Sequence, residues 1–288
     1  AHPGARPSPT TNQKVELRLT DYLNKSNEIT EDGIALLRQA ISDAVDHARE
    51  FKTDEILAFA TSAIRDARNG AQILANLNEE FGIEINILSG DEEATMTFLA
   101  ARRWYGWSAG RLLVIDIGGG STEIMLGTTQ LDIARSIDIG AVRVTERHLR
   151  RDPPAPEELL NAIGEVQDLF EDLLREFPEM EQAPQIIGTA GTIVTVAAVE
   201  IGQRVFDPAG LHAFHLTRSA IEDVFRTLAT ESLSDRAHNP GLPRDRADVI
   251  VGGCCVLVAL MRSLDADEMI VSAYNILDGV CAELLGNP

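Results

Sequence analysis

Hydrophobic and polar positions follow two different periods along the chain, and these periods predict strands and helices in turn. Short apolar or alternating runs predict strands at 15–20, 56–60, 83–88, 112–115, 122–126, 133–139, 185–187 and 269–272. Apolar residues that recur every three or four positions predict helices at 31–48, 71–81, 90–105, 156–177, 193–199, 220–228, 246–264 and 275–285. This mixture of strands and helices is typical of an α/β protein.

The stretch 112–127, LLVIDIGGGSTEIMLG, joins a buried strand to a loop suited to phosphate. Asp116 closes the strand with a carboxylate, and three glycines then leave a backbone that is open to a close-lying ligand and free to adopt positive φ. Backbone N–H groups in such a loop bind phosphate oxygens. The alternative is an ordinary glycine-rich turn. The predicted phosphate-binding residues here are Gly118, Gly119, Gly120 and Ser121.

A second small-residue turn follows the predicted strand at 185–187. The segment GTAGT at 188–192 precedes a helix, and a helix N-terminus binds anions through its free N–H groups. The alternative is a tight turn that needs glycines for packing. Neither glycine loop has the spacing of a dinucleotide-binding G-x-G-x-x-G or the lysine of a Walker loop.

Length and charge narrow the class of protein. The 288 residues suffice for one large or two medium domains, and no apolar run reaches the roughly 18 to 20 residues of a membrane span. The net charge of −20 argues against nucleic acid and anionic membrane as partners. Cys254, Cys255 and Cys281 lie in apolar segments, which predicts buried free thiols.

An acidic protein that binds phosphate must gather its positive charge locally. The available clusters are Arg102 and Arg103, then Arg143, Arg147, Arg150 and Arg151, and finally Arg244 and Arg246. We interpret any one cluster by itself as a solvated helix face or as partners of the surplus carboxylates.

Four stretches occur in the order typical of the exopolyphosphatase/guanosine pentaphosphate phosphatase family of the actin, Hsp70 and sugar-kinase superfamily. They are ATSAIRDARN at 60–69, LSGDEEA at 88–94, DIGGGSTE at 116–123 and GTAGT at 188–192. This resemblance implies an α/β fold of two ribonuclease-H-like, actin-like ATPase domains with a cleft between them. The implied domains are 1–108 and 109–274, with a final helix at 275–288 that joins the first.

The resemblance also implies the roles of individual residues. Glu93 matches the family's general base, and the alternative for its neighbours Asp91 and Glu92 is helix capping. Asp116 holds a divalent metal, Mg²⁺ or Mn²⁺, or positions the attacking water, and Glu123 joins the metal or lies on the surface. The residues that bind substrate phosphate are Arg65, whose alternative is a partner of Asp66, together with Gly118, Gly119, Gly120, Ser121, Gly188, Thr189 and Gly191. Arg246 and Asp248 resemble a less specific RAD segment.

The function that the resemblance implies is release of the terminal phosphate from polyphosphate or guanosine pentaphosphate, in the cytoplasm and as part of the stringent response, by a protein that forms homodimers. Two alternatives stay open: an ATP-binding kinase-like protein and a non-catalytic sensor of guanosine tetra- or pentaphosphate. The family's first phosphate motif, a strand that ends in D-x-G-S-N, is not found, because the sequence opens where the connection after that strand is expected. A preceding segment of the natural chain, or truncation, accounts for this.

Overall fold

The computed structural model describes residues 11, 13, 15, 17–106, 109–183, 185–274 and 276–284. Its described residues form two compact units, one up to Glu93 and one from Ala94 onward. These are called the smaller and the larger unit below, and each is described by itself.

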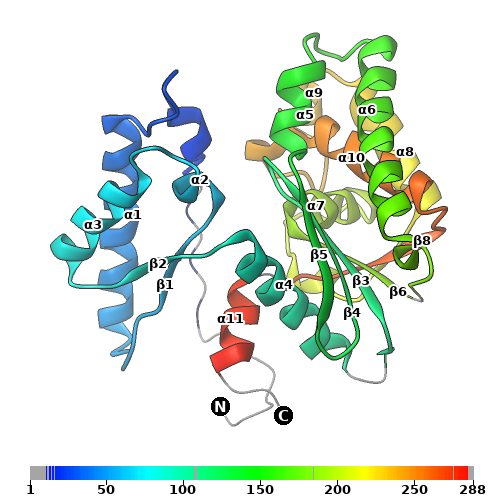
Figure 1. Ribbon diagram of the computed structural model, residues 1–288. Helices are drawn as coiled ribbons and strands as arrows, with labels where there is room; N and C mark the ends of the chain where they lie inside the picture. The colour runs from blue at the N-terminus through cyan, green and yellow to red at the C-terminus, as the bar shows by residue number, and fades with distance from the viewer. Residues whose placement is uncertain are drawn as a thin grey trace. The chain divides into compact units, whose positions relative to one another are not determined.

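The smaller unit packs its helices around a short parallel sheet (Figure 1). Its elements are η1 (Leu19–Tyr22), α1 (Glu31–Glu50), β1 (Ala58–Ala60), α2 (Ser62–Arg65), α3 (Gly70–Phe81) and β2 (Ile85–Ile87). Thr30 caps α1 by accepting a hydrogen bond from the Gly33 amide. The core includes Leu37, Ile64 and Leu77, and an apolar cavity of about 370 Å³ lies between α1 and the strands.

The strand predicted at 15–20 is wrong in its described part, and residue 16 lies outside the described residues. Arg18 has a left-handed backbone with φ of 43°, and Leu19–Tyr22 form a 3₁₀-helix instead. Alternating polarity fits both structures over so few residues, and no strand pairs with this segment among the described residues.

The larger unit is built on a six-stranded sheet of order β5-β4-β3-β6-β8-β7. The strands β3, β6 and β8 are parallel, and β4, β5 and β7 run antiparallel to their neighbours. The strands are β3 (Leu112–Ile117), β4 (Thr122–Gly127), β5 (Leu131–Ile137), β6 (Gln185–Thr189), β7 (His215–Thr217) and β8 (Glu268–Val271). The three successive strands predicted at 112–115, 122–126 and 133–139 are therefore confirmed, and they pair as an antiparallel meander.

Helices cover both faces of this sheet (Figure 1). The helices are α4 (Gly90–Tyr105), α5 (Ala141–His148), α6 (Pro156–Glu176), α7 (Ala190–Glu200), α8 (Arg218–Thr230), α9 (Leu233–Arg236), α10 (Ile250–Ser263) and α11 (Ile276–Leu284), with 3₁₀ turns η3 (Pro178–Met180), η4 (Ala209–Leu211) and η5 (Arg244–Arg246). Leu113 and Ile115 of β3 pack in the core with α6, α7 and α10, whereas Leu112 and Val114 pack against Phe98 of α4. Burial on both faces explains the unbroken apolar run of this strand.

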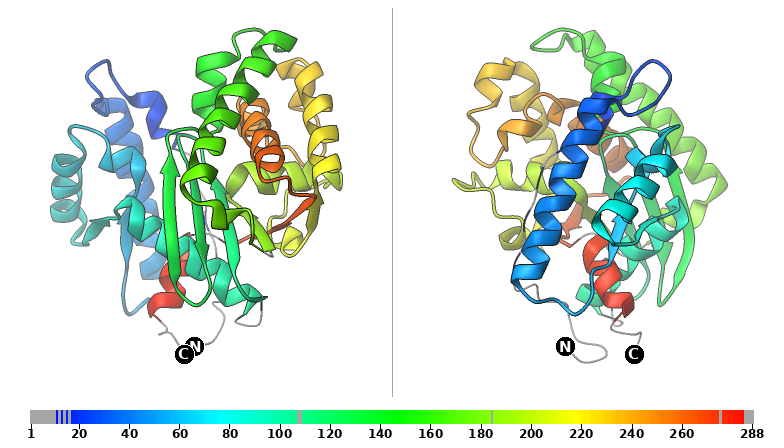
Figure 2. Two further views of the ribbon diagram at one scale, coloured as in Figure 1. Left: turned by 45° about the vertical axis from the view of Figure 1, so that its right-hand side comes forward. Right: turned by 90° about the vertical axis from the view of Figure 1, so that its left-hand side faces the viewer.

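The structure divides the chain differently from the predicted boundary at 108 and 109. Phe98 and Ala101 of α4 are buried against β3 and β4, so most of this helix belongs to the larger unit. Helix α11 also groups with the larger unit and lies beside α4 (Figures 1 and 2). Gly279 packs directly on the backbone of Met96. Asn275 and residues 285–288 of the predicted final helix lie outside the described residues.

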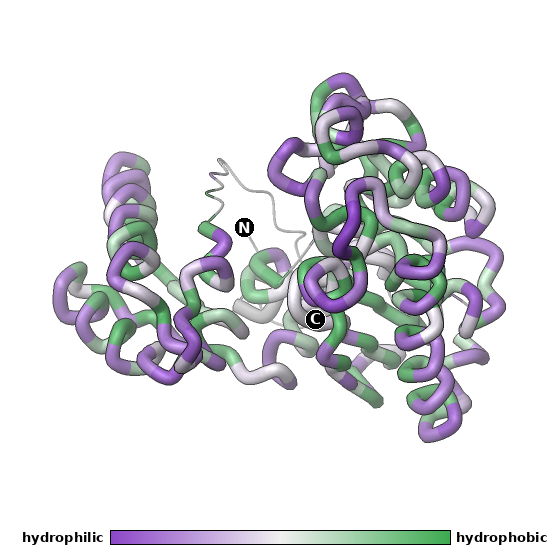
Figure 3. Tube along the Cα trace, turned by 90° about the horizontal axis from the view of Figure 1, so that it is seen from above, coloured by the Kyte–Doolittle hydropathy of each residue, from purple (hydrophilic) through white to green (hydrophobic). Residues whose placement is uncertain are grey.

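Most predicted helices are confirmed, and several alternate hydrophilic and hydrophobic positions along the chain (Figure 3). The helix predicted at 246–264 begins only at Ile250, because residues 244–246 form a 3₁₀ turn. The buried thiols are confirmed at Cys254 and Cys255, whereas Cys281 is exposed. Burial raises the pKa of the Cys254 thiol to about 12. None of the described helices is both long and apolar enough to cross a membrane.

Candidate phosphate and metal site

A row of polar side chains crosses the sheet of the larger unit at the carboxyl end of β3. Asp116 is in register with Glu123 on β4 and with Thr189 on β6, and Glu123 is in register with Ser136 on β5. Residues in register share one face of a sheet, so the two carboxylates are neighbours. The Ser136 hydroxyl donates a 2.8 Å hydrogen bond to Oε1 of Glu123. Sequence reasoning missed Ser136, because its partner became known only with the strand register.

Backbone hydrogen bonds from helix α5 anchor the glycine hairpin between β3 and β4. The amide of Gly118 closes the turn with a 3.0 Å hydrogen bond to the carbonyl of Ser121. The amides of Ala141 and Val142 donate to the carbonyls of Gly118 and Gly119, at 3.0 and 2.9 Å. The Gly118 amide is therefore used within the turn, whereas the amides of Gly119, Gly120 and Ser121 make no hydrogen bond within the described part of the chain and suit an anion.

These three glycines are free to adopt positive φ, but none of them does. Close approach is the reason for glycine instead. A Cβ on Gly119 would lie 3.3 Å from Val142, and one on Gly140 would lie 2.6 Å from the Gly119 carbonyl oxygen. Gly140 was not predicted, although a glycine just before a helix is a signal that sequence reasoning can use.

The second glycine turn lies between β6 and the N-terminus of α7. A Cβ on Gly191 would lie 2.0 Å from Nη1 of Arg246, so this guanidinium rests directly on the glycine backbone. A Cβ on Gly188 would meet the Met269 side chain at 2.6 Å, which makes that glycine a packing residue as well. Arg246 thus brings positive charge to a helix N-terminus, where an anion is already favoured.

Thr189 and Ala190 define the backbone of this turn. Thr189 is only 2% exposed. Its hydroxyl donates a 2.7 Å hydrogen bond to the carbonyl of Tyr274, so this proton is not available to a bound phosphate. Ala190 has φ of 67°, a left-handed conformation that is uncommon for a residue with a Cβ. Such strain is often stored at functional turns.

Arg65 and Glu93 meet in the smaller unit. Arg65 ends α2, and its Nη1 donates to Glu93 and, at 2.7 Å, to the carbonyl of Leu88. Its Nε lies 3.4 Å from Asp66, the predicted alternative partner. Burial by itself lowers the pKa of Arg65, but the hydrogen bond and charge of Glu93, with those of Asp66, raise the pKa above its ordinary value.

The three acids of the LSGDEEA stretch have different surroundings. Glu92 forms a capping box with Ser89, because its Oε2 accepts from the Ser89 amide at 2.7 Å while the Ser89 hydroxyl accepts from the Glu92 amide. The hydrogen bond from the Ser89 amide lowers the pKa of Glu92. The capping interpretation of Glu92 is therefore confirmed, and Glu93 is the acid of this stretch that contacts Arg65.

The arginines of the predicted clusters have different interaction partners. Arg102 is buried and donates to the carbonyls of Gly106 and Gly110, and burial lowers its pKa. Three others pair with carboxylates, namely Arg143 with Asp138, Arg147 with Glu165 and Arg151 with Glu157. Arg244 and Arg246 have no such partner among the described residues.

The donor set suits a metal that needs few protein ligands. Among the described residues no group of three or more His, Cys, Asp or Glu could hold a metal ion. Asp116 and Glu123 supply two neighbouring carboxylates beside the glycine hairpin. Proteins commonly bind Mg²⁺ through one or two carboxylates, with water and substrate phosphates as the other ligands.

Comparison with known proteins identifies the relatives of this chain. Exopolyphosphatase 1 of Mycobacterium bovis is 33% identical over 97% of this chain and 81% of its own length. Exopolyphosphatase 2 of Mycobacterium tuberculosis is 32% identical over 94% of this chain and 87% of its own. The crystal structure of the Ppx/GppA family member from Aquifex aeolicus is 26% identical, with a TM-score of 0.81 over 93% of this chain and 86% of that one.

These structural relatives have the actin-like two-domain fold, which confirms the predicted fold class. The sequence profile of the Ppx/GppA phosphatase family matches residues 2–287. With this match across nearly its whole length, and with curated relatives above 30% identity, the chain belongs to the Ppx/GppA phosphatase family.

Proposed function

We propose that the protein hydrolyses the terminal phosphoanhydride bond of inorganic polyphosphate. The observation that carries this proposal is the pair of neighbouring carboxylates, Asp116 and Glu123, directly beside the glycine hairpin. A carboxylate pair suits a divalent cation, and the amides of Gly119, Gly120 and Ser121 suit phosphate oxygens. The mycobacterial relatives named exopolyphosphatase indicate which phosphate compound to test first.

Asp116 and Glu123 are the residues that would hold Mg²⁺, or Mn²⁺, which also prefers oxygen ligands. The bound metal supplies charge neutralisation at the phosphate oxygens. Ser136 fixes the orientation of Glu123 through its 2.8 Å hydrogen bond. A ligand carboxylate that is held by a second hydrogen bond keeps its geometry when the metal exchanges.

The chain's own groups then act on the substrate. The hairpin amides, the N-terminus of α7 and Arg246 bind phosphate oxygens and stabilise the charge that spreads over them during transfer. Glu93 accepts a proton from the attacking water as the new O–P bond forms and the bridging P–O bond breaks, so that inorganic phosphate leaves the shortened chain. Arg65 positions Glu93 through their ion pair.

Guanosine pentaphosphate is the second substrate that we propose for the same groups, because it carries the same terminal phosphoanhydride bond. The guanosine part would add contacts that polyphosphate lacks. The ratio of kcat/KM for the two compounds ranks them.

Phosphate release from polyphosphate in the presence of Mg²⁺ tests the proposed function. We expect release that stops when EDTA removes the metal and returns when Mg²⁺ is added back. Binding of polyphosphate without release, by protein that circular dichroism shows to be folded, would favour the non-catalytic sensor instead. Release that EDTA leaves unchanged would contradict the metal site.

Gly191→Ala is expected to weaken binding of substrate phosphate. The new methyl group would lie 2.0 Å from Nη1 of Arg246, so the guanidinium must move off the glycine turn. A charged hydrogen bond contributes about 1.5 to 3 kcal/mol, so we expect KM for polyphosphate to rise roughly 10- to 150-fold.

Gly164→Ala in helix α6 is the matched control, because no atom lies within 4 Å of its added Cβ. Steady-state kinetics of both variants give the measurement. An unchanged KM in Gly191→Ala, with the fold intact, would show that Arg246 does not contact the substrate.

A further inference from the structure

A basic cavity lies at the C-terminal end of α7, at the opposite end of this helix from Gly191. Its volume is about 320 Å³, and it is lined by Arg204, Phe206, His238 and residues 239–243. The ionisable side chains in this lining are both basic. Nδ1 of His238 lies 2.7 Å from the carbonyl of Ser234, so this nitrogen carries a proton and donates it to that carbonyl. The lining thus favours an anion in a chain of net charge −20.

The segment from Gly241 to Arg246 connects this cavity with the second glycine turn. At one end, a Cβ on Gly241 would lie 2.2 Å from the carbonyl oxygen of Ala198, near the end of α7. At the other end, Arg246 rests on Gly191 at the start of α7. The helix has 11 residues, so the segment spans about 16 Å.

Unpaired positive charge is concentrated on this route. Most arginines of the larger unit pair with carboxylates. They are Arg111, Arg135, Arg143, Arg147, Arg151, Arg175, Arg218, Arg226, Arg236 and Arg262. In contrast, the guanidinium groups of Arg204, Arg244 and Arg246 make no hydrogen bond or ion pair within the described part of the chain. Asp245 lies between two of them, but successive residues of a 3₁₀ turn point in different directions.

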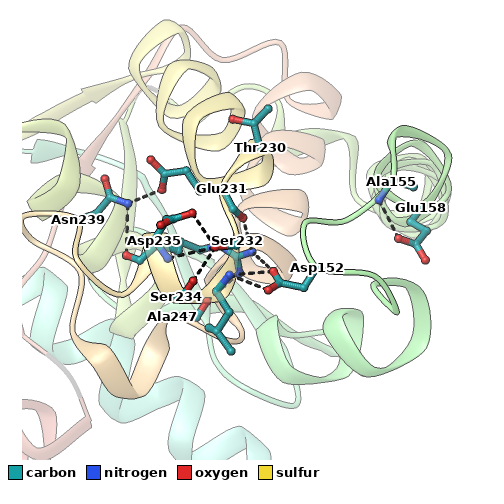
Figure 4. A network of polar contacts seen from close by, with 12 residues as sticks. Asp152, Ala155, Glu158, Thr230, Glu231, Ser232, Ser234, Asp235, Asn239 and Ala247 are labelled. Carbon is teal, nitrogen blue, oxygen red and sulfur yellow. Dashed lines mark hydrogen bonds and ion pairs between the residues drawn. The ribbon is translucent and has the colours of Figure 1, made fainter.

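A network of polar contacts holds the residues on either side of this segment, and Figure 4 shows Asp152, Glu231, Asn239 and Ala247 of this network. Nη1 of Arg236 donates to the carbonyl of Ala247 at 2.8 Å, and Nη2 donates to the carbonyl of Glu231 and to Asp152, both at 2.9 Å. The side chain of Glu231 in turn accepts a hydrogen bond from Asn239. The segment is therefore ordered before any ligand binds, which lowers the entropic cost of binding.

We propose that Arg204, Arg244 and the cavity form a second phosphate-binding tract, which holds the part of a long polyphosphate chain that lies beyond the terminal phosphate. This inference rests on the proposed function, since the tract extends the same substrate from the glycine turn and Arg246. Tripolyphosphate is too short to follow α7 to its far end. The tract therefore favours long polymers over short ones through KM.

The double variant Arg204→Ser/Arg244→Ser tests the tract. The matched control is Arg226→Ser/Arg262→Ser, which removes the same charge from arginines that pair with Asp223 and Glu222. The measured quantity is KM for long-chain polyphosphate relative to KM for tripolyphosphate. Two lost charged contacts are expected to raise this ratio roughly 10²- to 10⁴-fold in the test variant and less than about twofold in the control.

The outcomes separate this inference from the proposed function. An unchanged ratio in an active, folded test variant overturns the tract and leaves the proposed function intact. If the unsubstituted protein releases no phosphate from either polymer, the proposed function fails, and the tract is judged by calorimetric titration of long-chain polyphosphate in the presence of EDTA. Equal affinities of the test variant and the unsubstituted protein then overturn the tract, whereas affinity lost only in the test variant supports it.

Discussion

Asp116→Asn is expected to lower phosphate release by on the order of 10²- to 10³-fold while the protein stays folded. Asp116 lies at the centre of the polar row, in register with both Glu123 and Thr189. The amide has the same shape as the carboxylate but lacks its charge, so it binds a divalent cation poorly. Since the side chain is not fully buried, the substitution does not leave an isolated charge in the core.

Asp132→Asn is the control for this experiment. Asp132 also lies on the sheet, on β5, but it is exposed and pairs with Arg111. The initial rate of phosphate release is measured over a range of Mg²⁺ concentrations, and the thermal unfolding midpoint is measured for both variants. If Asp116 is a metal ligand, the Asp116→Asn variant also needs a higher Mg²⁺ concentration to reach its half-maximal rate. Full activity at the Mg²⁺ requirement of the unsubstituted protein would exclude this role.

Glu93→Gln is expected to lower kcat by about 10²- to 10⁴-fold, which is the range for loss of a general base. Glutamine keeps the length of the side chain and can accept a hydrogen bond from Arg65, but it cannot take a proton from water. Glu92→Gln supplies a matched control one residue away. Glutamine also completes a capping box with Ser89, so this control is expected to keep its activity within about twofold.

The ion pair between Glu93 and Arg65 offers another explanation for lost activity, because Arg65 itself would shift. Glu93→Asp separates the two roles. The shorter carboxylate still accepts a proton. If Glu93 is the general base, the Glu93→Asp variant is therefore expected to be much more active than Glu93→Gln. Equal activity of the two variants would contradict the base and leave Glu93 as a positioning residue for Arg65.

Sequence patterns predicted elements well where burial by itself decides the structure. The strand around Val114 is apolar on both faces, and the helix 90–105 has its acids in the first turn, so both were predicted close to their observed bounds. Helix α5 escaped prediction because it has only eight residues, of which Ala141 and Val144 are buried. Its position is set by hydrogen bonds to the glycine hairpin, and these form only in the folded chain.

Some features of the candidate site were likewise predictable from the sequence, and others were not. The motifs identified Asp116, Glu93 and the glycine loops, because their residue types follow one another in the chain. The polar row was not predictable, since β3 pairs with β6 in parallel across roughly 70 intervening residues and the register is a tertiary property. For the arginines, composition identified the clusters, and only the structure distinguishes Arg143, which pairs with Asp138, from Arg246, which lies on Gly191.

The hydrogen bonds from Ala141 and Val142 to the glycine hairpin have a consequence for motion. A loop of three glycines would otherwise be among the most flexible parts of a protein. Because α5 anchors its carbonyls, we expect the amides to keep their direction on the nanosecond timescale, with NMR order parameters near the roughly 0.85 of rigid backbone. The anion binding that we propose for this loop would then need no slow rearrangement.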